Sequence, residues 1–201
     1  MHDVGRIVRL QIQRSSLKTG EKPNRTYDPT PLLAVDRLAL GPDGVLGAGS
    51  DGSWVVDVHH RAHPRTKNED GAHGVSIGFT SHYALMRERF GDGMTLGCAG
   101  ENIIVETERR IALEDLQRGI VLLARDGQEL ARLEVLQVAE PCRPFAGWAL
   151  GGIVESRVLK ESLQFLEGGT RGYYCQGVGS GVLSIGDRVA LLDGERPVKG
   201  P

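Results

Sequence analysis

The chain has 201 residues, a length that suits one domain with a sizeable hydrophobic core. Its 24 Lys and Arg residues nearly balance its 26 Asp and Glu residues, which argues against nucleic acid or a membrane surface as the partner. The three cysteines include no CxxC pair, so we expect free thiols in a reducing compartment rather than a disulfide framework. No apolar run resembles a secretory signal or a membrane span, and we expect a soluble cytoplasmic protein.

Short runs rich in β-branched residues and leucine predict about seven strands. In chain order they lie at 4–12, 31–40, 54–60, 102–106, 119–125, 130–139 and 188–192. Asp126-Gly127 separates two of these runs, and such a pair supplies the positive φ that a tight hairpin needs. We therefore predict a mainly-β fold, a closed or nearly closed barrel that forms a single domain over residues 1–201.

Helices are predicted to be few and short. Residues 80–91 and 153–169 have apolar residues at helical spacing and a glycine at the end, and 112–119 suits one or two turns. The polar segment 15–31 is predicted to be a mobile loop, and the C-terminal residues 194–201 are predicted to be frayed.

The segment GAGSDG (47–52) fits the GxGxxG pattern of dinucleotide-binding loops. That motif works through the N-terminus of the helix that it opens, whereas here a predicted strand follows. We interpret it as a glycine-rich turn.

Histidines gather in the first half of the chain, at 59, 60, 63, 73 and 82. Two or three converging imidazoles with a carboxylate would suit zinc, although HExxH is absent. The alternative is that they are hydrogen-bonded loop residues. A third interpretation places them in an anion pocket together with Arg61, Arg65 and Lys67, because guanidinium and ammonium groups suit phosphate oxygens.

Cys142 lies between Pro141 and Pro144, whose fixed φ angles limit how far its thiol can move. A rigidly placed soft ligand suits metal–thiolate or persulfide chemistry, and Arg143 and Arg171 would favour a thiolate. The alternative is a buried, inert cysteine. Glu101 and Asn102 follow a glycine and lead into a strand, which places polar groups at a strand end or simply forms a turn.

Several segments together resemble the MOSC domain, named for the C-terminal region of molybdenum cofactor sulfurase. In chain order they are DVHHRAHPRTK (57–67), FTSHYALMRERFG (79–91), GCAGENIIVE (97–106), LEVLQVAEPCRPF (133–145) and GGTRGYYCQGVGSGVLSIGDRVALL (168–192). The resemblance covers residues 30–193 and implies a β-barrel of the MOSC type. It also implies a molybdopterin cofactor, and either reduction of N-hydroxylated compounds or sulfur transfer, with a separate protein as electron or sulfur donor.

The resemblance also implies roles for individual residues. Cys142 would carry sulfur or bind molybdenum as the catalytic residue, and Glu101 and Asn102 would belong to the pocket wall. A basic stretch would face the cofactor phosphate or the substrate, with Arg143 beside the thiol and Arg171 and Gly172 on the opposite rim. That stretch comprises His59, His60, Arg61, Arg65 and Lys67.

The chain departs from the family pattern in two places. Many members have Pro-Arg-x-Pro-Cys, and that register places the family cysteine at Phe145, with Cys142 where the arginine stands. The compact His-His-Gly-Gly pattern is replaced by a longer basic stretch. Two functions follow from this: a molybdenum-dependent or sulfur-carrying enzyme, or a non-catalytic module that binds an anion or cofactor without metal. Cys98 and Cys175 are assigned to packing.

Overall fold

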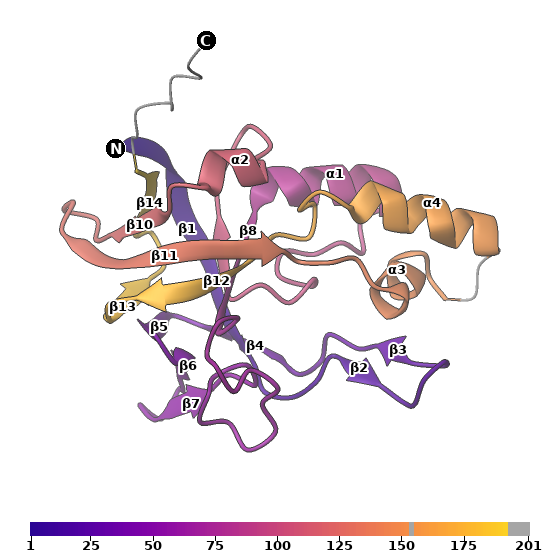
Figure 1. Ribbon diagram of the computed structural model, residues 1–201, viewed down its shortest axis with the longest axis horizontal. Coiled ribbons are helices and arrows are strands. Elements are labelled where there is room, and N and C mark those ends of the chain that lie inside the picture. The colour runs from indigo at the N-terminus through magenta and orange to yellow at the C-terminus, as the bar shows by residue number, and fades with distance from the viewer. Residues whose placement is uncertain (153–154, 193–201) are drawn as a thin grey trace, which may run out of the picture.

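The fold is a closed β-barrel with helices on one side, seen in a computed structural model that describes residues 1–152 and 155–192 (Figure 1). The barrel strands are β1 (His2–Gln13), β8 (Val75–Phe79), β9 (Ile103–Val105), β10 (Ile120–Leu123), β11 (Glu129–Val138), β12 (Tyr173–Val178) and β14 (Arg188–Leu191). They follow one another in the order β14-β10-β11-β12-β8-β9-β1, and β1 pairs with β14 to close the ring. The predicted mainly-β barrel is confirmed.

A smaller sheet packs beside the barrel. Its strands, in the order β13-β5-β6-β7, are β13 (Gly181–Ser184), β5 (Arg37–Gly41), β6 (Gly44–Ala48) and β7 (Trp54–Val56). β4 (Leu32–Val35) extends the barrel sheet beyond β1. β2 (Lys18–Thr19) and β3 (Thr26–Tyr27) form a separate hairpin.

The hairpin predicted from Asp126-Gly127 is confirmed. β10 and β11 pair antiparallel, Gly127 has a φ of 93°, and the amide of Ala124 donates to the carbonyl of Gln128 at 2.8 Å. The glycine-rich segment 47–52 is likewise a turn between β6 and β7, as expected.

The prediction of about seven strands was too low, because fourteen occur within the described residues. The run at 31–40 divides at the exposed Asp36 into β4 and β5, which pair with different strands. The run at 54–60 stops at Val56. β8 was missed because Ser76 and Gly78 interrupt its apolar pattern, although all five of its residues are buried.

Helices occur where they were predicted: α1 (Thr80–Phe90), α2 (Leu113–Leu116) and α4 (Ser156–Leu166). α3 (Arg143–Ala149) was not predicted, although Pro144 in its first turn is compatible with a helix start. Residues 153 and 154 of the predicted second helix and the tail 194–201 lie outside the described residues. No helix in the described ranges is both long and apolar enough to span a bilayer.

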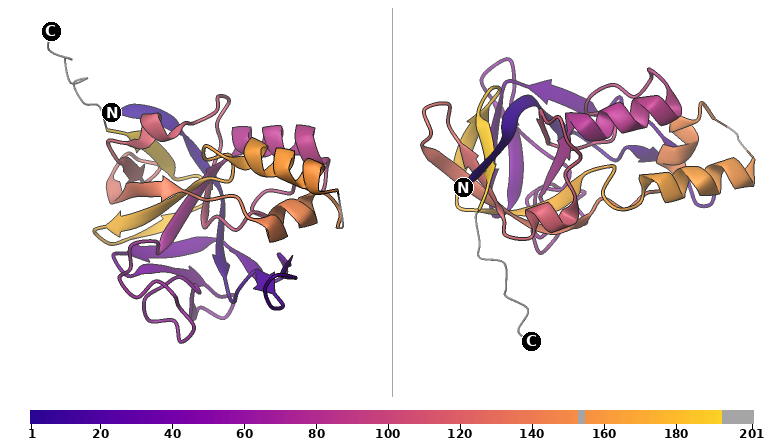
Figure 2. Two further views of the ribbon diagram at one scale, coloured as in Figure 1. Left: turned by 45° about the vertical axis from the view of Figure 1, so that its right-hand side comes forward. Right: turned by 90° about the horizontal axis from the view of Figure 1, so that it is seen from above.

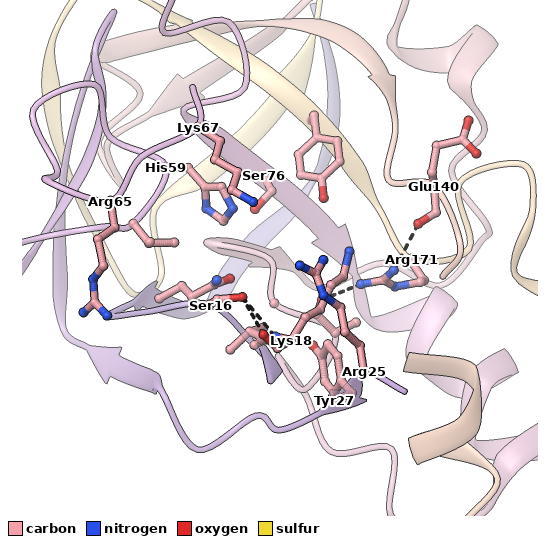
Figure 3. Close-up of a pocket in the computed structure, with 16 residues that line it drawn as sticks. Ser16, Lys18, Arg25, Tyr27, His59, Arg65, Lys67, Ser76, Glu140 and Arg171 are labelled. Atoms are coloured by element: carbon pink, nitrogen blue, oxygen red, sulfur yellow. Dashed lines mark hydrogen bonds between the residues drawn. The ribbon is translucent and has the colours of Figure 1, made fainter. Parts of the chain in front are cut away.

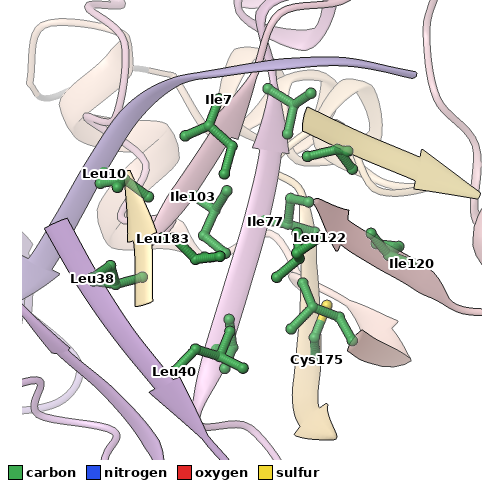
Figure 4. Packing of buried hydrophobic residues seen from close by; sticks show 14 of the residues in the cluster. Ile7, Leu10, Leu38, Leu40, Ile77, Ile103, Ile120, Leu122, Cys175 and Leu183 are labelled. Carbon is green, nitrogen blue, oxygen red and sulfur yellow. The ribbon is translucent and has the colours of Figure 1, made fainter. Parts of the chain in front are cut away.

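Two large apolar clusters and a small third one at Val121, Leu123 and Ala190 hold these elements together. The barrel interior is filled by side chains such as Ile7, Ile77, Ile103 and Leu122 (Figure 4). The second cluster lies between the barrel and the helices α1, α3 and α4, which share one side of the molecule (Figure 2). Its buried residues include Leu17, Tyr27, Tyr83, Met86, Phe145 and Leu166.

The segment 15–31, predicted to be a mobile loop, is anchored in this second cluster. Leu17 and Tyr27 are each only 6% exposed, and the Tyr27 hydroxyl donates to the carbonyl of Cys98 at 2.7 Å. The hairpin β2–β3 therefore has a defined position beside α3.

His82 on α1 predicts a pH dependence of stability. Burial lowers the pKa of this imidazole to about 4 from its ordinary 6.5. Between these two pH values the imidazole is protonated in the unfolded chain but not in the folded one. The contribution of His82 to the free energy of unfolding is therefore complete above pH 6.5 and is lost as the pH falls toward 4. The loss is on the order of 3 kcal/mol. In urea titrations, we expect the free-energy difference between wild type and His82→Gln to shrink over this window; parallel curves would contradict the assignment.

Candidate functional site

A cavity of about 290 Å³ opens between the hairpin β2–β3, the 58–67 segment and the start of β12 (Figure 3). Five cationic side chains line it: Lys18, Arg25, Arg65, Lys67 and Arg171. None of them lies within ion-pair distance of a carboxylate among the described residues. Glu140 is the one acidic lining residue in the described ranges, and its carboxylate points away from the labelled cations in Figure 3. The cavity therefore has a positive potential and suits an anion.

Arg171 is the most deeply buried of these cations, with 7% of its surface exposed. Its Nη1 donates to the carbonyl of Glu140 at 3.1 Å and its Nη2 to that of Ala99 at 3.0 Å. Its Nε is buried and has no hydrogen-bond partner within residues 1–152 and 155–192. Neighbouring polar groups, Tyr27 first among them, raise the pKa of this guanidinium despite its burial, so it stays charged.

The thiol of Cys142 lies against the same guanidinium, with Sγ 3.7 Å from Nη1 of Arg171. Cys142 is half-buried and precedes α3 as its N-cap residue. The sulfur does not line the cavity itself but lies behind Arg171, next to the second apolar cluster. The thiol is thus fixed at the edge of the charged site.

Phe145, the position that the family register assigns to cysteine, contacts Arg171 as well. The guanidinium carbon of Arg171 lies 4.2 Å from the centre of the Phe145 ring. The two positions are one helical turn apart, and both face the same guanidinium. Cys142 and the residue at the family's cysteine position thus contact the same guanidinium in this chain.

The other two cysteines are buried, with 5% of Cys98 and 0% of Cys175 exposed. Burial raises the pKa of the Cys98 thiol to about 12, and it raises the pKa of the Cys175 thiol further. Both remain protonated near neutral pH, in agreement with a packing role.

Asp57 holds His59 at the cavity wall. Its Oδ1 lies 3.0 Å from Nδ1 of His59 and accepts the His59 amide at 2.8 Å. Its Oδ2 accepts the amide of Gln13 at 2.6 Å and Nδ2 of Asn102 at 3.0 Å. The carboxylate is fully buried, so it fixes the orientation of the ring and leaves Nε2 for a ligand.

Glu101 lies below the cavity rather than in its lining. Tyr83 donates its hydroxyl to Oε2 at 2.6 Å, and burial raises the pKa of the Glu101 carboxyl. Asn102 is equally buried and bridges β1, β8 and Asp57 through its side-chain amide. Both residues support the pocket floor from outside.

The cavity lining includes four of the residues predicted for cofactor binding: His59, Arg65, Lys67 and Arg171. Three others lie elsewhere on the surface or in turns. His60 accepts the Ala62 amide at 3.1 Å, Arg61 is 3.7 Å from Asp43, and Arg143 lies in a neighbouring groove. No three His, Cys, Asp or Glu side chains in the described ranges form a metal-holding group, so the histidine zinc site has no support there.

Sequence reasoning missed Lys18 and Arg25 because it treated their segment as a mobile loop. The sequence signal that could have identified them is the pair of apolar residues, Leu17 and Tyr27, on either side of a short polar stretch. Both are buried in the structure. Anchoring at both ends brings the cations between them to the cavity.

Comparisons with known proteins agree with this fold. The sequence profile of the MOSC domain matches residues 68–190. The crystal structure of the YuaD protein from Bacillus subtilis aligns over 94% of each chain at 13% identity, with a TM-score of 0.57. That of YiiM from Escherichia coli aligns over 81% of this chain and 65% of its own at 14% identity, with a TM-score of 0.51. Among curated protein sequences, none matches significantly.

The lining cations predict phosphate binding. The substitution Arg65→Gln should lower the affinity for inorganic phosphate roughly tenfold, because a charge-assisted hydrogen bond is lost. Isothermal titration calorimetry measures this affinity. Arg61→Gln is the matched control, since Arg61 carries the same charge in the same segment but lies outside the lining. Equal weakening by both variants would show a diffuse surface effect instead of a cavity.

Proposed function

The chain belongs to the MOSC domain family, and from this premise we propose that its cationic cavity binds the phosphate end of a molybdopterin-type cofactor while Cys142 serves as metal ligand or sulfur carrier. The observation that carries the proposal is the buried guanidinium of Arg171, which contacts the Cys142 sulfur and lacks a carboxylate partner among the described residues. One cation thereby joins the thiol to the anion site.

The residues present fit the phosphate of such a group. Lys18, Arg25 and Arg171 converge in Figure 3, and Lys67 approaches from the opposite side. None of these side chains lies within ion-pair distance of a carboxylate in the described ranges, so an incoming anion meets cations that are not already paired. Ala99 and Gly100 add uncharged lining to the same cavity.

The residues present also suit a thiolate contact. Cys142 is the one partly exposed cysteine among the three, and its position before α3 is fixed by the packing of Phe145 and Ala146. Arg171 places a positive charge beside the sulfur, in contact with it. His59, held by Asp57, would bind or move a proton at Nε2 on the other side of the cavity.

When bound, a molybdenum–pterin group supplies two-electron redox or sulfur-transfer chemistry, with N-hydroxylated compounds as the substrate class for reduction. In this proposal a separate protein supplies the electrons or the sulfur.

A second candidate is anion binding without metal. It is favoured by one observation: Cys142 stands behind Arg171 and does not itself line the cavity. In that case the protein would hold a phosphorylated small molecule, and the thiol would only pack against the guanidinium.

Molybdenum content separates the two candidates. We expect near-stoichiometric molybdenum by elemental analysis after expression in a host that makes the cofactor, and a more than tenfold loss in Cys142→Ala. Cys175→Ala is the control because that thiol lies inside the barrel. Equal molybdenum in wild type and Cys142→Ala would exclude the thiol as ligand, and phosphate binding without any molybdenum would support the metal-free module.

A further inference from the structure

A groove of about 510 Å³ adjoins the cationic cavity and lies between β3 and α3, which pack side by side (Figure 1). Arg25 and Tyr27 line both spaces, so the groove and the cavity share a wall. The rest of the groove lining consists of Thr26, Arg143, Pro144, Gly147, Trp148, Gly151 and Gly152.

Trp148 supplies an aromatic surface in this groove. Its ring is half-buried and packs against Tyr27 at 5.4 Å and Phe145 at 5.8 Å between ring centres. Three glycines among the lining residues have no side chains to cover it. The indole is thus rigidly placed and remains available for stacking with a planar ring.

Two arginines give the groove a positive charge. Neither Arg25 nor Arg143 lies within ion-pair distance of a carboxylate in the part of the chain that the structure describes, and the groove lining includes no acidic residue there. Nε of Arg25 is buried and has no hydrogen-bond partner among the residues that the structure describes. A guanidinium in this state favours a planar anion such as a carboxylate, which it can bind through two hydrogen bonds.

We propose that this groove binds a planar aromatic anion, the simplest being an aromatic carboxylate, with its ring on Trp148 and its charge between Arg25 and Arg143. The groove is a site of its own; that it would serve as the substrate subsite beside the cavity rests on the function proposed above. The shared wall of Arg25 and Tyr27 would then bring the bound ring next to the cavity that holds the cofactor.

The chain has two tryptophans, which makes the test specific. Trp54 lies on β7 and is 40% exposed, so Trp54→Phe leaves Trp148 as the single tryptophan reporter. We expect 2-naphthoate to change the Trp148 emission of this variant on red-edge excitation and to bind wild type in calorimetry. The neutral 2-naphthamide and the non-planar cyclohexanecarboxylate should each bind at least tenfold more weakly, because one lacks the charge and the other the flat ring.

The substitution Arg143→Gln should lower the affinity for 2-naphthoate roughly tenfold. It should leave the affinity for phosphate unchanged, because Arg143 lines the groove and not the cavity. The control substitution Arg157→Gln removes one positive charge from α4, outside the groove, and should change neither affinity. The substitution Lys67→Gln should lower the affinity for phosphate and leave that for 2-naphthoate unchanged. The proposed phosphate site in the cavity and the proposed aromatic site in the groove can therefore be refuted separately. No binding of 2-naphthoate, equal binding of the three probes, or an unchanged affinity in Arg143→Gln would overturn the proposal.

Discussion

The site depends on one buried charge, the guanidinium of Arg171. It lies between the Phe145 ring, the Cys142 sulfur and two backbone carbonyls, and no carboxylate among the described residues lies within ion-pair distance of it. Removing a cation from water without an opposite charge costs several kcal/mol. The protein offsets part of this through the two carbonyl bonds and the aromatic face, and an anionic ligand would offset more. A buried charge without an ion-pair partner destabilises the fold, and such charges are typical of binding sites.

The second apolar cluster keeps that charge in place. It joins α1, α3 and α4 to the barrel and anchors the hairpin β2–β3 through Leu17 and Tyr27. Phe145 belongs to this cluster and also contacts Arg171, so packing and site geometry are coupled through one side chain. The barrel itself contributes the rigid ends of β8 and β12, from which Ser76 and Tyr174 reach the cavity.

Much of the barrel could be predicted from local patterns, because many of its strands contain runs of β-branched residues and leucine. The hairpin between β10 and β11 also has the Asp-Gly signal. Two barrel strands, β8 and β12, were not predicted. Burial on both faces of β8 leaves no alternation, and the Ser76 hydroxyl donates to Asn102, a contact distant in the sequence. α3 was not predicted because Pro141 and Pro144 suggested an extended loop, although Pro144 occupies the first turn of the helix.

Prediction of the site was partial for a similar reason. The basic stretch indicated an anion pocket, and Arg65 and Lys67 line the cavity, but local sequence does not show which way each side chain of a turn points, and Arg61 faces Asp43 instead. Lys18 and Arg25 arrive only through the tertiary packing of their hairpin.

The central claim is that Arg171 and its neighbouring cations form an anion receptor, and a crystal structure of the protein grown in phosphate tests it most directly. The account predicts a phosphate within hydrogen-bond distance of the Arg171 guanidinium and the Lys67 ammonium. A structure in saturating phosphate with no anion in the cavity, and with Arg171 turned to pair with the carboxylate of Glu101, would contradict it.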